Sequence, residues 1–247
     1  MIEKSGKTVL ITGAARRIGA VTARLFHQSG YTVIVHYNRS AAAANRLCSE
    51  LNELRADSCL LVQADLNSEA GIDKICQLVW DLGRLDVLVN NASSFYPTPL
   101  ENCDQSQWDD LVNSNLKGPF FITQKLSPLL EKQRGAVVNI SDIHGRQALA
   151  KHPIYTVAKG GNIAMTKAMA LELAPSVRVN SVAPGAILWP EHEEDDQDKH
   201  SEVLKGVPLG RLGNEMDIAE AVYFLAVKAT YVTGQTIAVD GGRSSSL

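Results

Sequence analysis

The sequence lacks the features that mark a membrane, secreted or disulfide-stabilised protein. In its 247 residues no apolar run approaches the roughly 20 residues that a membrane-spanning helix needs. Its four cysteines show no CxxC spacing, so we expect reduced packing residues rather than disulfides or a metal site. The first residues, MIEKSGK, lead directly into a predicted strand. We therefore expect no signal peptide and a cytoplasmic protein.

An excess of charge of one sign is also missing. The chain has 24 basic and 27 acidic residues, which gives a formal net charge of −3. This balance lacks the positive surface that nucleic acid or an anionic membrane attracts, so we expect neither as a partner. Because 45% of the residues are hydrophobic, the chain can build one large core, whereas two full domains would be cramped at this length.

Short apolar runs alternate with helical patterns along almost the whole chain. This alternation predicts βαβ units, which require right-handed crossovers and a parallel sheet. Several runs are apolar on both faces, as in strands that helices cover on each side. We therefore predict an α/β fold, a single-domain Rossmann-type doubly wound parallel sheet with helices on both faces. The predicted strands are residues 8–11, 32–37, 58–64, 86–90, 136–140, 177–182 and 236–240.

The predicted single domain, residues 1–247, has two functional parts. A cofactor half spans about residues 1–140, and a catalytic and substrate part spans about residues 141–247. The second part includes a substrate segment at about residues 186–205, which we expect to be mobile.

Residues 191–202, EHEEDDQDKHSE, are acidic and show no strand period. We interpret them as a solvated surface segment. A metal site built from His192, His200 and the carboxylates is the alternative, but nothing in the spacing fixes its geometry, so no metal is predicted.

The stretch TGAARRIG, residues 12–19, follows the first predicted strand. Gly13 and Gly19 suit a turn that offers free N–H groups and a helix dipole to a phosphate, although tight packing alone would also explain them. Arg17 stands where a further glycine would let the backbone approach a pyrophosphate. The turn therefore predicts a dinucleotide site with an unusual cation in it.

The end of the second predicted strand, HYNRS at residues 36–40, indicates which dinucleotide binds. An NAD site needs a carboxylate here for the ribose hydroxyl, and this sequence has none. Arg39 and Ser40 instead suit a 2′-phosphate, although Arg39 would also serve as a solvated cation at a helix start. We therefore predict NADPH as the cofactor. Asp65, just past the third strand, is the predicted acceptor for the adenine amino group.

The stretch YTVAK places Tyr155 and Lys159 four residues apart on a predicted helix that begins near Pro153. Residues at this spacing share one helix face, so both side chains would point into one site. A neighbouring ammonium group would lower the tyrosine pKa and help the hydroxyl deliver its proton near neutral pH. YxxxK alone often arises by chance. Because it follows a dinucleotide-binding half, we interpret it as a catalytic pair.

Taken together, these motifs resemble the short-chain dehydrogenase/reductase family over nearly the whole chain. The resemblance rests on the glycine turn, NNA at 90–92, Asn115 in VNSNLKG, the Tyr155–Lys159 pair and PG at 184–185. It implies that Tyr155 donates the proton, that Lys159 holds the nicotinamide ribose and that Asn115 anchors a proton-relay water. It also implies a homotetramer, as related reductases usually form.

The resemblance also implies a set of cofactor contacts. They are Gly13, Arg17, Ile18, Gly19, Tyr37, Asn38, Arg39, Ser40, Asp65, Leu66, Asn91, Ala92, Ser93, Tyr155, Lys159, Pro184 and Gly185.

The sequence departs from the usual family pattern at Asp142, in NISDIHG. It occupies the place of the serine that orients a ketone, thirteen residues before Tyr155. A carboxylate beside the alkoxide of ketone reduction would be adverse by several kcal/mol in a dry site. A nitrogen heterocycle instead offers N–H donors that a carboxylate accepts. We therefore expect a heterocyclic substrate, with an inert substitution in a loop as the alternative.

Arg17, Asp142 and the stretch NASSFYPTPL at 91–100 resemble the pteridine reductase subgroup. That resemblance implies that Arg17 contacts both cofactor phosphate and pterin, and that Phe95 stacks on the pterin opposite the nicotinamide. Core packing of Phe95 is the alternative, but its surroundings form a poor strand and a poor helix. The predicted substrate contacts are Arg17, Ser93, Phe95, Asp142, Tyr155, Leu188 and Trp189, and the predicted catalytic residues are Asp142, Tyr155, Lys159 and Asn115.

The leading hypothesis is therefore an NADPH-dependent reductase of dihydropterins, with dihydrofolate as a further candidate substrate. A general carbonyl or 3-ketoacyl reductase is the alternative within the same family, and Asp142 disfavours it. A catalytically silent NADPH-binding regulator is the alternative of a different class. The intact Tyr155, Lys159 and Asn115 argue against the regulator, because a sensor has no use for a proton relay.

Overall fold

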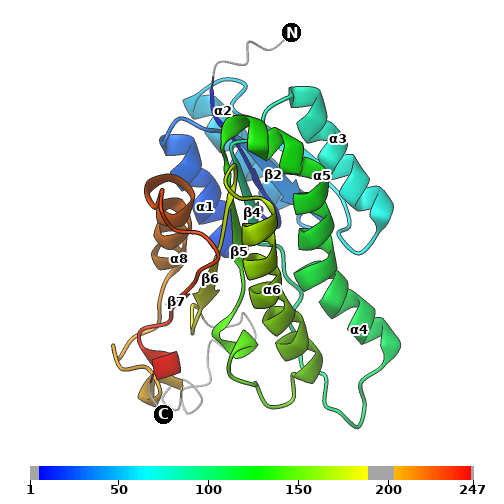
Figure 1. The fold of residues 1–247 in the computed structure, drawn as a ribbon, viewed down its shortest axis with the longest axis vertical. Helices are drawn as coiled ribbons and strands as arrows, with labels where there is room; N and C mark the ends of the chain where they lie inside the picture. The colour runs from blue at the N-terminus through cyan, green and yellow to red at the C-terminus, as the bar shows by residue number, and fades with distance from the viewer. Residues whose placement is uncertain (1–5, 189–202, 246–247) are drawn as a thin grey trace.

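A computed structural model describes residues 6–188 and 203–245. Its centre is a seven-stranded sheet with the order β3-β2-β1-β4-β5-β6-β7, and every neighbouring pair of strands is parallel. Helices cover both faces of this sheet (Figure 1). The strands are β1 Thr8–Ile11, β2 Thr32–Tyr37, β3 Cys59–Gln63, β4 Val87–Asn90, β5 Ala136–Ile140, β6 Arg178–Pro184 and β7 Thr236–Val239.

The two faces of the sheet bury two separate apolar clusters, because alternate side chains of each strand point to opposite sides. One cluster joins Val9 and Val33 to Phe26 and Ile218 on covering helices. The other joins Leu88 on β4 to Ile122 and Met165 on other covering helices. The longer helices are α1 Arg17–Gln28, α2 Ala41–Leu54, α3 Glu69–Leu82, α4 Gln105–Val112, α5 Gly118–Gln133, α6 Pro153–Glu172 and α8 Glu215–Tyr223.

Sequence order reverses between β1 and β4, which lie side by side at the centre of the sheet. In open α/β sheets a ligand binds at such a switch point, beyond the carboxyl ends of the strands. The glycine turn after β1 and the Asn91–Ala92 segment after β4 therefore meet at this place. A π-helical turn, η1 Asn113–Lys117, continues α4 into α5.

The predicted fold class is confirmed, and all seven predicted strands occur within two residues of their predicted bounds. α6 begins at Pro153, as the YTVAK stretch predicted. Within the described chain, the structure contains no helix that is long and apolar enough to cross a membrane. The whole acidic stretch, residues 191–202 with His192 and His200, lies outside the described residues, as does Trp189.

Candidate active site

Three of the four predicted catalytic side chains meet beyond the carboxyl end of β5. Tyr155 and Lys159 stand one turn apart on α6, and Asp142 follows β5. The Tyr155 hydroxyl donates a hydrogen bond to Asp142 Oδ2 at 2.7 Å. The Lys159 Nζ donates to the Ile140 carbonyl at 2.9 Å. Tyr155 and Lys159 are buried, with 4% and 2% of their surface exposed, so packing and hydrogen bonds within the chain hold the pair in place.

The protonation of this cluster differs from the sequence-based expectation. Burial and the Asp142 carboxylate raise the pKa of Tyr155 well above its usual value. Lys159 does not offset this rise, because its Nζ lies over the tyrosine ring, 5.6 Å from the ring centroid, and donates to Ile140. The prediction of a lowered tyrosine pKa is therefore wrong for this state. A raised pKa keeps the phenol protonated, which is the form that an acid needs.

Lys159 responds to burial in the opposite direction. Removal from water disfavours its charged form and lowers its pKa to about 8, although Asp142 partly counteracts the effect. The ammonium group therefore loses its proton within the pH range of ordinary assays.

Asn115 lies in η1 and connects α4–α5 to the loop after β4. Its side chain accepts a 2.7 Å hydrogen bond from Ser93 Oγ and donates to the carbonyls of Ser94 and Leu111, both at 2.9 Å. Its main-chain carbonyl accepts from Asn162 Nδ2 at 3.0 Å. The side chain thus fixes the loop that carries Ser93 and Phe95, a function that the spacing of VNSNLKG does not reveal.

Phe95 lies at the lip of the site, with 53% of its surface exposed, and not in the core. Its ring contacts Tyr155 in an edge arrangement at 4.8 Å. The His152 imidazole stacks on it at 4.9 Å with an interplanar angle of 6°. Sequence reasoning missed His152, which directly precedes α6 and could be recognised only by its place three residues before Tyr155.

At the cofactor end, the glycines of the turn are required by close packing. A Cβ on Gly13 would lie 2.8 Å from the Ala92 Cα, and one on Gly19 would lie 2.5 Å from the Gly13 carbonyl oxygen. Asn91 Nδ2 holds the same turn by donating to the carbonyls of Thr12 and Gly13. The tight packing that is the alternative explanation of these glycines is therefore present, and their role in binding a phosphate stays a prediction.

Arg17 opens α1 with a positive φ of 50°, a conformation that glycine adopts at little cost. An ordinary side chain in this conformation costs roughly 1–2 kcal/mol. The backbone therefore keeps the shape of a glycine turn although the residue is arginine. Such strain is often stored at ligand-binding positions, and here it leaves the guanidinium group exposed beside the turn.

His36 is a cofactor-end residue that sequence reasoning missed. Its Nδ1 accepts from the Gly13 N–H at 3.1 Å, and its Nε2 lies 3.1 Å from the Ala64 carbonyl. It is buried, which lowers its pKa to about 4 and keeps the ring neutral. A neutral ring with its proton on Nε2 satisfies both partners, so His36 ties the glycine turn to the ends of β2 and β3. The feature of the sequence that could have indicated His36 is its position at the start of HYNRS, the segment assigned to the cofactor site.

The predicted adenosine contacts lie along the edge formed by β2 and β3. Asp65 Oδ1 accepts from the Asn67 N–H at 3.0 Å and from Asn38 Nδ2 at 3.4 Å. Neither Arg17 nor Arg39 has a hydrogen-bond or ion-pair partner for its guanidinium group among residues 6–188 and 203–245. The other predicted contacts of this edge are the half-buried Ile18, Tyr37 and Ser40 and the buried Leu66.

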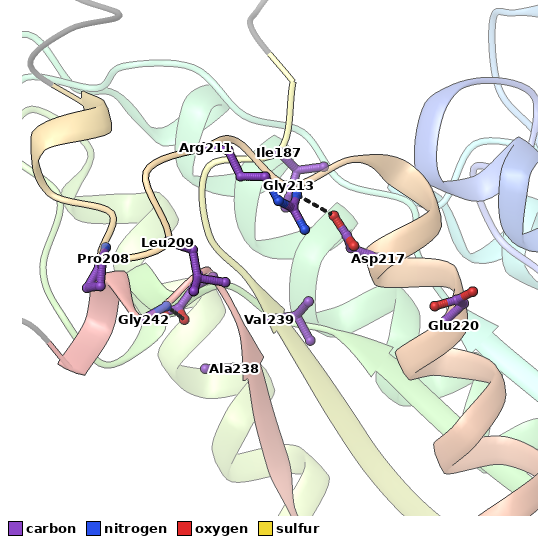
Figure 2. A pocket seen from close by; sticks show the side chains of 12 residues that line it. Ile187, Pro208, Leu209, Arg211, Gly213, Asp217, Glu220, Ala238, Val239 and Gly242 are labelled. Carbon is purple, nitrogen blue, oxygen red and sulfur yellow. Dashed lines mark hydrogen bonds and ion pairs between the residues drawn. The ribbon is translucent and has the colours of Figure 1, made fainter.

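The predicted nicotinamide border leads to a cavity that no motif indicated. A cavity of about 480 Å³ lies between β7, α8 and the segment after β6 (Figure 2). Ile187 lines it, next to the predicted substrate residue Leu188. It adjoins the family's PG motif, because Gly185 N–H donates to the Val239 carbonyl in the cavity wall at 3.1 Å. An ion pair between Arg211 and Asp217 at 3.1 Å lies on one side (Figure 2).

No group of three or more metal-ligating side chains occurs in the part of the chain that the structure describes.

A family model described as enoyl-(acyl carrier protein) reductase matches residues 13–244. The chain belongs to the short-chain dehydrogenase/reductase family. It is therefore an oxidoreductase of a family that uses NAD(P)H.

Curated relatives include two kinds of reductase. The chain is 37% identical to the 3-oxoacyl-(acyl-carrier-protein) reductase FabG of Staphylococcus aureus over 242 residues, which cover 97% of this chain and 98% of that protein. It is 40% identical to FabG of Thermotoga maritima over 243 residues, with 96% and 97% covered. Pteridine reductase 1 of Leishmania tarentolae is 37% identical over 284 residues, with 95% of each chain covered. The FabG matches rank higher, so the comparisons favour the ketoacyl alternative over the pteridine subgroup.

Proposed function

We propose that this protein is an NADPH-dependent reductase of pteridines, which converts dihydropterins, and also dihydrofolate, to their tetrahydro forms. The observation that carries the proposal is the 2.7 Å hydrogen bond from the Tyr155 hydroxyl to Asp142. It places a carboxylate beside the proton donor. A ketone becomes an alkoxide at that position, and the carboxylate would repel the developing charge. A ring N–H or amino group instead donates to the carboxylate.

The preference for NADPH is supported by the exposed cations of the cofactor end. Within the part of the chain that the structure describes, the guanidinium groups of Arg17 and Arg39 have no hydrogen-bond or ion-pair partner, and the sequence HYNRS has no acid that would repel a 2′-phosphate. The packed Gly13 and Gly19 fit the group, because any Cβ there would fill the space against the backbone. When bound, the nicotinamide would supply a hydride. Lys159 is the residue that would hold its ribose, and Pro184 and Gly185 would border the ring.

In this proposal the chain's own residues orient the heterocycle and deliver one proton. Asp142 accepts from the heterocycle, and Tyr155, kept protonated by its raised pKa, donates to the reduced ring nitrogen. Phe95 offers exposed ring surface for stacking against a flat substrate. Arg17 and Ser93 are both exposed, and in this proposal both contact the pterin as well as the cofactor.

A 3-oxoacyl reductase is the second candidate, and the FabG relatives favour it. A third candidate, the silent NADPH-binding regulator, is disfavoured by the assembled Tyr155–Asp142 and Lys159 contacts. The decisive experiment follows NADPH oxidation with a dihydropterin, dihydrofolate, a 3-oxoacyl thioester and a simple ketone. It compares the native protein with Asp142→Asn and Asp142→Ser.

A pteridine reductase should reduce the dihydropterin, and Asp142→Asn should lower that turnover by about two orders of magnitude, within the usual range for a lost acid–base group. Asp142→Ser should lose pterin turnover and gain weak ketone turnover, because the adverse charge is gone. Rapid native reduction of the thioester with no reduction of any pteridine would reject the proposal in favour of the second candidate.

We also propose that the protein is a homotetramer. Large apolar side chains are exposed on α4 and α5, among them Trp108 at 41%, Phe120 at 42% and Phe121 at 39%. Exposed clusters of this kind mark interaction surfaces. Light scattering coupled to size-exclusion chromatography should give four times the 26.7 kDa chain mass.

A further inference from the structure

A line of buried amide and hydroxyl side chains connects the centre of the sheet to the active site. Asn90 Nδ2, at the end of β4, donates to Thr123 Oγ1 on α5 at 3.2 Å and to Asn139 Oδ1 on β5 at 2.8 Å. Asn139 Nδ2 donates to Thr166 Oγ1 on α6 at 2.9 Å. None of these side chains is more than 2% exposed. Each hydrogen bond therefore forms in a low-dielectric interior, where an unpartnered polar atom is costly.

Asn162 ends this line beside the catalytic residues. Its carbonyl accepts from Thr166 Oγ1 at 2.9 Å, and its side-chain Nδ2 donates to the main-chain carbonyl of Asn115 at 3.0 Å. It stands three residues after Lys159 on α6, so both side chains share one face of that helix. Asn162 is thus the link between the buried line and η1.

The Asn162 amide has one orientation that fits. The Asn115 carbonyl only accepts, so the amide nitrogen must face it and Oδ1 must face away. Oδ1 is buried and has no hydrogen-bond partner among the described residues. A buried acceptor without a donor is costly, and a bound water commonly satisfies such a group.

Asn115 has one accepting position left for a water, because a main-chain carbonyl oxygen can accept two hydrogen bonds. Its side chain is engaged with the loop after β4, and its carbonyl already accepts the Asn162 amide. A buried water makes about three hydrogen bonds, so the water that the family resemblance assigns to Asn115 needs further partners, and a second acceptor can supply one of them.

We propose that Asn162 is a positioning residue of the proton supply. Its amide nitrogen fixes the Asn115 carbonyl in η1, and its Oδ1 holds a buried water next to Lys159. Each turnover takes one proton from the Tyr155 hydroxyl, and one proton must return from solvent to the phenolate. The water held by Asn162 lies on that return path. This proposal concerns the oxidoreductase chemistry of the family and does not depend on which substrate is reduced.

The test compares Asn162→Leu with Asn162→Ala. Leucine fills the volume but excludes water, whereas alanine leaves room for a water that replaces the amide. We expect Asn162→Leu to lower kcat at least tenfold, less than the roughly 10²–10⁴-fold loss of the proton donor itself. The solvent deuterium isotope effect on kcat should rise, and the KM for NADPH should stay unchanged. Asn162→Ala should keep a higher kcat than Asn162→Leu.

A purely structural role gives the opposite order. Alanine would leave a cavity, which is usually costlier than an apolar replacement of similar volume. If Asn162→Leu keeps native kcat and a native isotope effect, or exceeds Asn162→Ala, the proposal is rejected. Should Asn162→Leu not fold, Asn162→Met carries the same expectation, because its flexible side chain adapts to irregular sites.

The matched control is Thr123→Val, at the far end of the same buried line. It removes the hydrogen bond to Asn90 without touching η1, so it should lower the Tm and leave kcat within about twofold, as for a lost structural hydrogen bond. An equal loss of kcat in Thr123→Val would assign the effect to the fold. All variants are measured with whichever of the dihydropterin or the 3-oxoacyl thioester the native enzyme reduces faster. Failure of the pteridine proposal therefore leaves this test intact.

Discussion

The two sides of the candidate active site are built in opposite ways. On the catalytic side, Tyr155 and Lys159 are at most 4% exposed and already make hydrogen bonds within the chain. On the cofactor side, Arg17 and Arg39 are exposed, and their guanidinium groups have no partner in the described chain. Tyr155 and Lys159 thus have their hydrogen-bond partners within the chain, whereas the cofactor side consists of exposed cations whose proposed partner is a phosphate.

Burial explains the difference. A buried polar group that lacks a partner costs free energy in every folded molecule, so the catalytic groups are satisfied internally. Water satisfies the donors of an exposed guanidinium group, so the group needs no partner within the chain for the protein to fold. Substitutions on the catalytic side should therefore change turnover, and substitutions on the cofactor side should change affinity.

The largest expected effect is the loss of the proton donor on the catalytic side. Tyr155→Phe keeps the ring but removes the hydroxyl that donates to Asp142, so kcat should fall about 10²–10⁴-fold. The KM for NADPH should change little. Steady-state kinetics of this variant, of a Lys159→Ala variant and of the double variant should give strongly non-additive losses. Near-native turnover in Tyr155→Phe would require a different proton donor.

Phe95 tests the boundary between the two sides, because it is exposed yet contacts Tyr155. Phe95→Ala removes a stacking surface worth roughly 1–3 kcal/mol, by analogy with bases stacked on aromatic side chains. The KM of a dihydropterin should rise by about one to two orders of magnitude, with the KM for NADPH unchanged. An unchanged pterin KM would remove Phe95 from the substrate site.

Arg39 tests the cofactor side. Charge-assisted hydrogen bonds contribute about 1.5–3 kcal/mol, and exposure reduces that value, so Arg39→Ala should raise the KM for NADPH about tenfold. The KM for NADH should stay nearly constant, because NADH has no 2′-phosphate. Ser→Ala at the exposed Ser106 is a suitable control, since it lies on α4, away from the turn. Equal native efficiency with NADH and NADPH would contradict the assignment.

The sequence was sufficient for those parts of the molecule that local pattern determines. Alternation of apolar runs located all seven strands, and the i, i+4 spacing put Tyr155 and Lys159 on one face of α6. These features depend on residues that are close together in the chain. Sequence alone also identified the exposed position of Phe95, because its segment suits neither a strand nor a helix.

Other parts of the site depend on residues that are far apart. The pKa of Tyr155 is set by Asp142 and by burial, and neither the direction of the tyrosine hydroxyl nor its burial can be read from YTVAK. The stacked His152, the Gly13–His36 hydrogen bond and the Asn162–Asn115 hydrogen bond arise between separate elements. Their residue types are ordinary, so no motif distinguishes them before the chain folds.

A pH profile tests whether the catalytic side works as a charged unit. Lys159 has a pKa of about 8, below the ordinary lysine value because the group is buried. Below this pKa the ammonium form is present, and above it the charge is lost. If the charge is needed, kcat/KM should be constant below about pH 7, about half its plateau value at pH 8 and about fourfold lower at pH 8.5, which follows from one proton released with a pKa of about 8. A flat profile to pH 9.5, with folding verified by circular dichroism, would show that the charge is not needed.

The smallest expected effect concerns Arg17 on the cofactor side, whose backbone has the left-handed conformation that favours glycine. Arg17→Gly relieves a left-handed conformation worth roughly 1–2 kcal/mol but adds about 0.5–1 kcal/mol of glycine entropy in the unfolded chain. The free energy of unfolding in urea should therefore rise by about 0.5 kcal/mol, while the KM for NADPH rises severalfold. A variant that is more stable but binds NADPH more weakly would indicate that the arginine serves ligand binding in this turn and not the stability of the fold. A loss of stability above about 1 kcal/mol would instead mean that the Arg17 side chain supports the fold.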